Sequence, residues 1–232
     1  MKTAIAILTV IGLCIAARAA RVFNGTSQGG TIPSALDYPF TISFWAYPAA
    51  TNNNFCPVCI QSNATAGGRL LVGVVGSSGF PGVWRVDAGG AGDAQTGALA
   101  QPNVWQHVAV TAASPSNRSI WVNGTAYGPN AVSNATRLVP QSINIGQRWS
   151  SGFGQYWTGR LAAVAIWNSV LSDGVIAALA AGKRPDNADP TAPILYLPMF
   201  GTTSTENSLA GTIGAVTLTN TPTLETHPPT YR

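Results

Sequence analysis

The chain has 232 residues, of which 46% are hydrophobic and only 9% are charged. This length suits one large β domain, and the regular apolar runs exclude a disordered chain. The net charge of +4 comes from scattered basic residues without a cluster, which argues against nucleic acid as a partner. The chain has only eight acidic residues, which limits both metal binding and acid–base chemistry.

Residues 1–20 have the pattern of a leader. Lys2 gives a charged start, residues 4–17 are almost entirely apolar, and Ala17-Arg18-Ala19 fits a cleavage site with small residues. The apolar run is too short for an ordinary membrane span of about 20 residues. Two interpretations stay open, a signal peptide or a retained apolar arm. We assign 1–20 to the leader and 21–232 to one domain, and we expect no stable membrane span.

The first half of the domain alternates apolar and polar residues, as half-buried β-strands do. We predict a short strand over 21–26 and a longer one over 38–47, in which Phe40, Ile42 and Phe44 share one face. Further strands are predicted over segments that are rich in β-branched residues and bounded by turn formers. They are 55–61, 69–75 and 83–87, followed by a glycine-rich link over 89–92.

Residues 104–125 predict a hairpin followed by a second turn. Two alternating runs, 104–111 and 119–123, flank a polar break over 113–117 that is rich in turn-forming residues. Asn123-Gly124 then supplies the positive φ angles that a two-residue hairpin turn requires.

The second half contains the only predicted helix. Apolar residues recur at helical spacing over 169–181, and Gly182 ends the pattern. A loop follows over 183–193, and strands are predicted over 137–139, 142–145, 157–167, 194–199 and 215–219. Ten or more short strands with one small helix indicate an all-β fold, an antiparallel two-sheet sandwich.

Five segments in this order and spacing resemble the laminin G-like, concanavalin A-like jelly-roll family. They are PFTISFWAYP (39–48), NVWQHVAVT (103–111), SIWVNGT (119–125), INIGQRW (143–149) and WTGRLAAVAIWNSVLS (157–172). The resemblance covers roughly 21–223 and extends, more loosely, to phage and bacterial surface proteins. Family members often begin with a strand like LYLPMFG, which lies here at 195–201. We therefore expect a permuted chain whose last strands close against its first.

The acidic residues do not match the catalytic pattern of this fold. Glycosidases of this kind place two carboxylates on one strand face, whereas the only glutamates, Glu206 and Glu225, lie in the polar C-terminal region. His107 would need a nucleophile and an orienting acid to act as a base, and the resemblance implies a structural role for it. We expect no enzyme; a glycoside hydrolase or lyase is a minor alternative.

Cys56 and Cys59 form a CxxC pair in a predicted β segment. The absence of a βαβ context argues against a redox dithiol, and one pair does not make a four-ligand zinc site. We predict a disulfide between them, which suits an oxidising compartment and requires a turn at Pro57-Val58.

Calcium is the one metal that the resemblance suggests. Laminin G-like relatives often bind it at the rim of the sandwich through oxygen ligands, of which the ion takes six to eight. Asp87 and Asp93 flank the glycine-rich link and are the candidate ligands, and Asp186 with Asp189 is a weaker pair. The alternative is that these are solvated loop acids.

The strongest candidate for ligand binding is the segment around GFGQYW. Flat aromatic rings suit the faces of sugars, and arginine and glutamine side chains hydrogen-bond hydroxyl groups. The candidate residues are Arg148, Trp149, Gln155, Tyr156 and Trp157. The alternative is that the tryptophans cap the core, and this alternative is stronger for Trp157, which begins a strand.

These observations favour a non-catalytic recognition or adhesion protein, secreted or on a virion surface. Its expected partner is a glycan or a surface protein. The alternative is a structural decoration or filament subunit, similar to a capsid cement protein, that uses the N-terminal arm to bind copies of itself or capsid neighbours.

Overall fold

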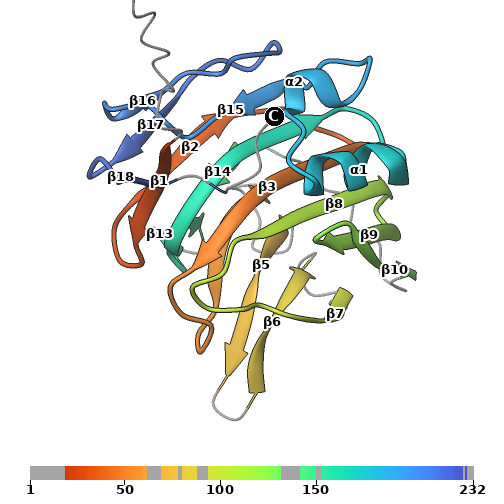
Figure 1. Cartoon of the computed structure of the whole chain (residues 1–232), viewed down its shortest axis with the longest axis horizontal. Helices are drawn as coiled ribbons and strands as arrows, with labels where there is room; N and C mark the ends of the chain where they lie inside the picture. The colour runs from red at the N-terminus through yellow and green to blue at the C-terminus, as the bar shows by residue number, and fades with distance from the viewer. Residues whose placement is uncertain are drawn as a thin grey trace, which may run out of the picture.

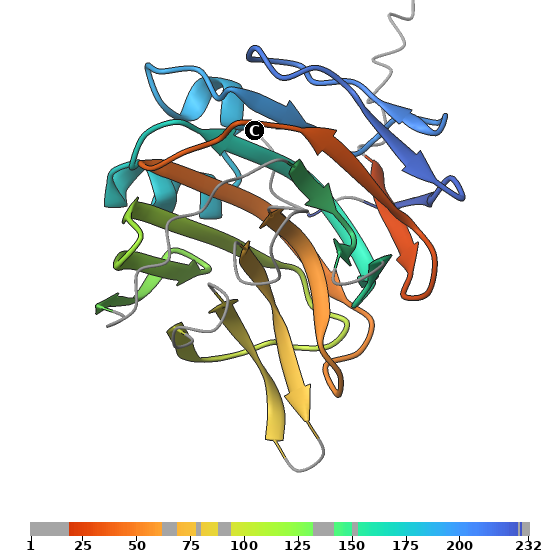
Figure 2. The same cartoon turned by 180° about the vertical axis from the view of Figure 1, so that it is seen from behind.

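The computed structural model describes residues 19–61, 69–77, 80–87, 94–131, 142–149, 153–226 and 228. Two antiparallel sheets of eight strands each lie face to face as a jelly-roll sandwich (Figures 1 and 2). The all-β prediction is confirmed. No helix in the described ranges is long and apolar enough to cross a membrane.

Sheet I contains the longest strand of the described residues, which is ten residues long. Its order is β10 (Thr125–Ala131), β9 (Asn117–Val122), β8 (Gln106–Ser114), β3 (Phe40–Pro48), β14 (Thr158–Trp167), β1 (Ala19–Asn24) and β18 (Thr223–Thr226), and β15 (Leu195–Leu197) also pairs with β14.

Sheet II lies behind it in Figure 1 and faces the viewer in Figure 2. Its order is β16 (Thr205–Glu206), β17 (Val216–Thr219), β2 (Gly29–Pro33), β11 (Ser142–Ile145), β4 (Phe55–Gln61), β5 (Arg69–Ser77), β6 (Phe80–Asp87) and β7 (Ala94–Leu99). A small hairpin joins β12 (Arg148–Trp149) to β13 (Phe153–Gly154).

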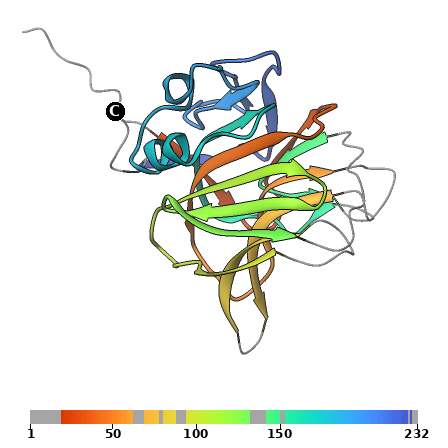
Figure 3. The ribbon, with the colours of Figure 1, turned by 90° about the vertical axis from the view of Figure 1, so that its right-hand side faces the viewer.

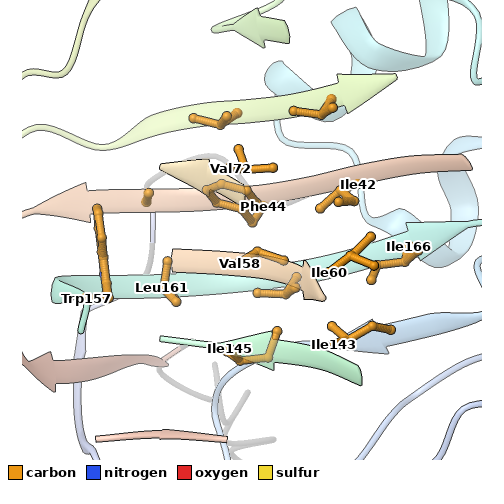
Figure 4. Close-up of a cluster of buried hydrophobic side chains, with 14 of the residues drawn as sticks. Ile42, Phe44, Val58, Ile60, Val72, Ile143, Ile145, Trp157, Leu161 and Ile166 are labelled. Atoms are coloured by element: carbon orange, nitrogen blue, oxygen red, sulfur yellow. The ribbon is translucent and has the colours of Figure 1, made fainter. Parts of the chain in front are cut away.

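The core lies between the sheets and is built by alternating side chains. Figure 4 shows Ile42 and Phe44 of β3 meeting Val58 and Ile60 of β4 across the sandwich. The isoleucines of β11 join the same buried cluster. Because these residues are fully buried at every second position, the polar residues between them must point away from the core.

The outer face of sheet I is covered by α1 (Asp173–Ala180) and α2 (Pro185–Ala188) (Figures 1 and 3). Ile176 and Leu179 of α1 pack with the outward-facing Trp45 and Trp167. The helix predicted over 169–181 forms but is shorter, since α1 spans Asp173–Ala180. The second helix, α2, lies within the segment 183–193, which was predicted to be a loop.

One residue of β14 breaks the predicted alternation. The pairing with β3 shifts between Ala162 and Ala165, and Ala163 has a φ of 51°. This β-bulge places Leu161 and Val164 in the core and both Ala162 and Ala163 on the helical side. Strict alternation along the predicted strand 157–167 would place Ala163 on the same face as Leu161, and the bulge overturns this.

The Asn123-Gly124 turn is confirmed. The two residues have φ angles of 50° and 79°, and Val122 pairs with Thr125 directly across the turn. The predicted strand over 137–139 and the glycine-rich link over 89–92 lie outside the described residues.

The two ends of the domain pair with each other, as the resemblance implied. β18 pairs with β1, and β17 pairs with β2. Ala19 and Ala20 already belong to β1, so the strand begins before the predicted boundary at residue 21. The earlier leader residues lie outside the described part of the chain.

A buried ion pair links these ends. The Nε and Nη2 atoms of Arg21 both donate to Oε2 of Glu206 at 3.1 Å, and Nη1 of Arg21 donates to the carbonyl of Pro222 at 3.0 Å. Glu206 also accepts the backbone N–H groups of Phe200 and Gly201 at 3.0 and 2.9 Å. Both charged groups are therefore well paired away from water.

We predict that Glu206→Gln destabilises the domain by about 3–5 kcal/mol, because it leaves the buried guanidinium of Arg21 without its counter-charge. Urea unfolding followed by tryptophan fluorescence measures this loss. Glu225→Gln is the matched control. Its carboxylate binds Arg160 at 3.1 Å but is 50% exposed, so its loss should cost less than about 1 kcal/mol. Equal effects of the two substitutions would contradict the prediction.

Candidate functional site

The β12–β13 hairpin brings two of the predicted ligand-binding residues together. Arg148 pairs with Gly154, so the chain returns next to itself. Nη1 of Arg148 then donates to Oε1 of Gln155 at 2.7 Å. Both side chains are half-buried, so the hairpin fixes a guanidinium beside an amide at the surface.

The end of this hairpin is anchored to sheet II. Gln155 has a φ of 47°, and its carbonyl accepts the backbone N–H of Cys56 at 3.1 Å. Tyr156 forms an isolated parallel bridge with the same residue of β4. The half-buried Tyr156 is thereby held beside the start of β4. The side chain of Trp149 lies outside the described residues.

Trp157 belongs to the core, so its prediction as a ligand-binding residue is corrected. Its side chain is 0% exposed and stacks on Trp84 with ring centroids 6.2 Å apart. Its backbone donates to Gly146 and accepts from Gly25, both at 2.9 Å. Trp157 thus closes one end of the sandwich (Figure 4).

A chain of polar side chains that the sequence analysis did not identify runs across β2 and β11. Nε2 of Gln147 donates to Oγ1 of Thr31 at 3.2 Å, and this hydroxyl donates to Oδ1 of Asn144 at 2.8 Å. Nδ2 of Asn144 contacts Oγ of Ser142 at 3.4 Å. Thr31 is exposed, whereas the other three are buried. The available signal was the alternation of these polar residues with isoleucines.

Gly29 makes room for this chain. A Cβ atom at Gly29 would lie 2.5 Å from Cδ of Gln147, so the amide packs directly on the backbone of β2. Because Gln147 precedes Arg148, the polar chain continues into the β12–β13 hairpin. We define Thr31, Gln147, Arg148, Gln155 and Tyr156 as the candidate site. It offers amide, hydroxyl and guanidinium groups beside one aromatic ring.

The predicted disulfide is not formed. Cys56 and Cys59 are both buried and are not joined to each other. β4 is a strand from Phe55 to Gln61, with a register shift against β5 between Phe55 and Val58 in place of the turn that the disulfide requires at Pro57-Val58. Sγ of Cys59 instead lies 3.4 Å from Oε1 of Gln61.

The structure does not describe the side chains of the two predicted calcium ligands, Asp87 and Asp93. Asp93 lies outside the described residues, as does the side chain of Asp87, whose backbone pairs with Leu71. The described residues contain no group of three or more His, Cys, Asp or Glu side chains that would hold a metal ion. Calcium binding stays a prediction.

Three of the described carboxylates bind arginine side chains. Of those whose side chains are described, Glu206 alone is buried, and it is neutralised by Arg21. Asp186 binds Arg184 at 2.6 Å, and Glu225 binds Arg160 at 3.1 Å. A glycosidase would need an acid and a second carboxylate facing one cleft.

His107 lies on the opposite side of the molecule, in sheet I under the helices. Its Nε2 is 2.9 Å from Oγ of Ser43. Burial lowers the pKa of His107 from 6.5 to about 3 because a charged imidazolium loses its hydration there. The imidazole is therefore neutral at physiological pH.

The sequence matches the family model of the concanavalin A-like lectin/glucanases superfamily over residues 24–177. The chain belongs to this superfamily. No curated protein sequence matches it.

Several solved structures share the fold at low sequence identity. A proposed carbohydrate-binding protein of Bacteroides ovatus is 17% identical with a TM-score of 0.66, and the match covers 93% of this chain and 61% of that one. Domain 4 of the arabinanase AbnA from Geobacillus stearothermophilus, solved with arabinotriose, is 16% identical with a TM-score of 0.55, over 69% of this chain and 76% of that one.

A third similar structure is the CBM40 module of a Ruminococcus gnavus sialidase bound to α2,3-sialyllactose. It is 12% identical with a TM-score of 0.56, and the match covers 69% of this chain and 97% of the module. At these identities the likeness establishes the jelly-roll fold.

We predict that Cys56 and Cys59 resist maleimide labelling in the native protein and react once urea exposes them, because both thiols are buried. Peptide mass mapping of β4 without a reducing agent measures this. A β4 peptide that lacks two hydrogens and takes no label after unfolding would instead show the disulfide.

Proposed function

We propose that this protein is a non-catalytic, extracellular glycan-recognition module whose ligand binds at the candidate site. The observation that carries the proposal is the 2.7 Å contact between Arg148 and Gln155, held at the end of a polar chain on sheet II. Such fixed donors and acceptors suit sugar hydroxyls, because little side-chain entropy is lost when the ligand binds.

The composition of the site supports a saccharide. Tyr156 offers an apolar ring with a polar edge, which matches the mixed faces of a pyranose or furanose. Thr31 and Gln155 add a hydroxyl and an amide, and Arg148 adds a charged donor. The described residues add no carboxylate to this cluster, which favours binding over bond cleavage.

The similar structures guide the choice of probes. The AbnA domain was solved with arabinotriose and the CBM40 module with α2,3-sialyllactose. One is a neutral saccharide and the other an acidic one, so together they cover the two main classes that the site's amides and guanidinium would recognise.

We predict that the native protein binds immobilised glycans on an array that includes arabinotriose and α2,3-sialyllactose. Arg148→Ala should weaken the strongest binding at least tenfold, since a hydrogen bond to a charged group contributes about 1.5–3 kcal/mol. Tyr156→Ala should also weaken it, because the apolar ring that packs on the sugar is lost. Isothermal titration with the strongest array ligand measures the Kd of each variant.

The matched controls are Arg160→Ala and Tyr47→Ala. Both residues are half-buried and lie on sheet I, where the guanidinium of Arg160 stacks 4.5 Å from the ring centroid of Tyr47. They should leave the Kd unchanged. Absence of any array binding, or equal losses in the controls, would overturn the proposal and favour a structural role.

A further inference from the structure

The helices α1 and α2 and the loop between them form a cap over the outer face of sheet I (Figure 1). We use the term helical cap for residues 173–188. Apart from the hydrogen bonds inside the two helices, the described backbone hydrogen bonds of the helical cap all join residues within 172–187. The helical cap is held on the sheet by the apolar side chains of Ile176, Leu179 and Ala188. It is therefore a unit that local opening would release without disrupting a strand ladder.

A small space remains between the helical cap and the sheet. It is too narrow to hold a water molecule and is lined by Ser43, Trp45, His107, Ala163, Leu179, Lys183 and Pro185. Two strands, the bulge of β14 and both helices thus converge on one histidine.

His107 is held firmly in this space. Its side chain is 1% exposed, its ring lies 5.4 Å from that of Trp45, and Nε2 contacts Oγ of Ser43. Its backbone N–H donates to Oδ1 of Asn123 at 2.9 Å. Nδ1 is buried and has no hydrogen-bond partner in the part of the chain that the structure describes. The neutral ring is tolerated here, but an added proton would find no acceptor.

The described residues that line the space around His107 include no carboxylate that would balance the positive charge of an imidazolium. Among the described residues that line the space, Lys183 alone is charged, and it is exposed to solvent. Asp173 begins α1 and does not line the space, and Asp186 of α2 is bound to Arg184 at 3.0 and 2.6 Å. An imidazolium there would lose its hydration, and no carboxylate of the described residues lines the space to offset that loss.

We propose that the helical cap is an acid-sensitive element that lifts from sheet I when His107 takes up a proton. This inference concerns the face opposite the candidate glycan site and does not depend on the proposed function. The open state exposes the imidazole to water and lets it ionise. Acid therefore favours opening by mass action.

The direction of the pH effect follows from linkage. The pKa of His107 is about 3 with the helical cap closed and should approach its ordinary value of about 6.5 when the histidine is solvated. The closed state is fully favoured above about pH 6.5 and loses stability as the pH falls from there towards 3. Between pH 7.5 and 5.0 the open fraction should rise about 30-fold.

Hydrogen–deuterium exchange with mass spectrometry tests this on the full chain. We expect peptides covering 173–188 to exchange about 30-fold faster at pH 5.0 than at pH 7.5, after correction for the intrinsic pH dependence of amide exchange. Peptides of β4 in sheet II serve as the internal reference and should not change. Equal corrected rates for the helical cap at both pH values would overturn the proposal.

Two substitutions separate His107 from general acid effects. His107→Gln removes the titrating group but keeps a hydrogen-bonding partner for Ser43, and it should abolish the pH dependence. Lys183→Glu places a carboxylate at the space and should reduce the dependence, because it stabilises the imidazolium in the closed state. Undiminished pH dependence in His107→Gln would refute the proposal.

A third measurement leaves His107 and its surroundings intact. The chain has two histidines, so His227→Ala leaves His107 as the only imidazole signal in an NMR titration. We expect the ring to remain neutral through pH 6 and to titrate together with helical-cap opening. Protonation near pH 6.5 with the helical cap closed would contradict the mechanism.

Discussion

The burial of every second side chain between two sheets is the constraint on which the rest of this structure depends. Phe44 of β3 and Ile60 of β4 lie in the core, so their neighbours Ser43 and Cys59 point outward. The outer faces then become specialised. One receives the apolar helical cap, and the other carries a hydrogen-bonded row of polar side chains. Both arrangements follow from the alternation of side chains along a strand, because the residues that point outward are mainly apolar under the helical cap on sheet I and polar along β2 and β11 in sheet II.

Strong local patterns made much of the fold predictable. β4 has the predicted bounds at both ends, and the Asn123-Gly124 turn forms with the expected backbone angles. β2 was missed because Gly29-Gly30 has no strand propensity. Its glycines are instead required by neighbours, since a Cβ at Gly30 would lie 2.5 Å from Cγ2 of Val216. The helix α2 was missed because a four-residue element within a proline-rich segment has no detectable periodicity.

The site was less predictable because it depends on pairing between strands. The contact of Arg148 with Gln155 needs only a local hairpin, and the sequence placed both residues in one candidate segment without predicting the hairpin. The link from Gln147 to Thr31 joins residues far apart in the chain, and only the register of β2 against β11 brings Thr31 beside Asn144. For Trp157, composition alone did not distinguish a ring that binds sugars from one that fills a core. Burial against Trp84 decides the matter.

The bulge at Ala163 divides β14 into two parts in which side chains of opposite parity face the core. Before it, odd-numbered Leu161 lies in the core, and after it, even-numbered Val164 and Ile166 do. The single extra residue thus reverses which of the alternating side chains face the core in the second half of β14. Insertion or deletion of one residue within β14 keeps the facing of the side chains on one side of the change and inverts it on the other. Changes of length would therefore be confined to the loops around this strand, and only the identity of its residues is open to variation.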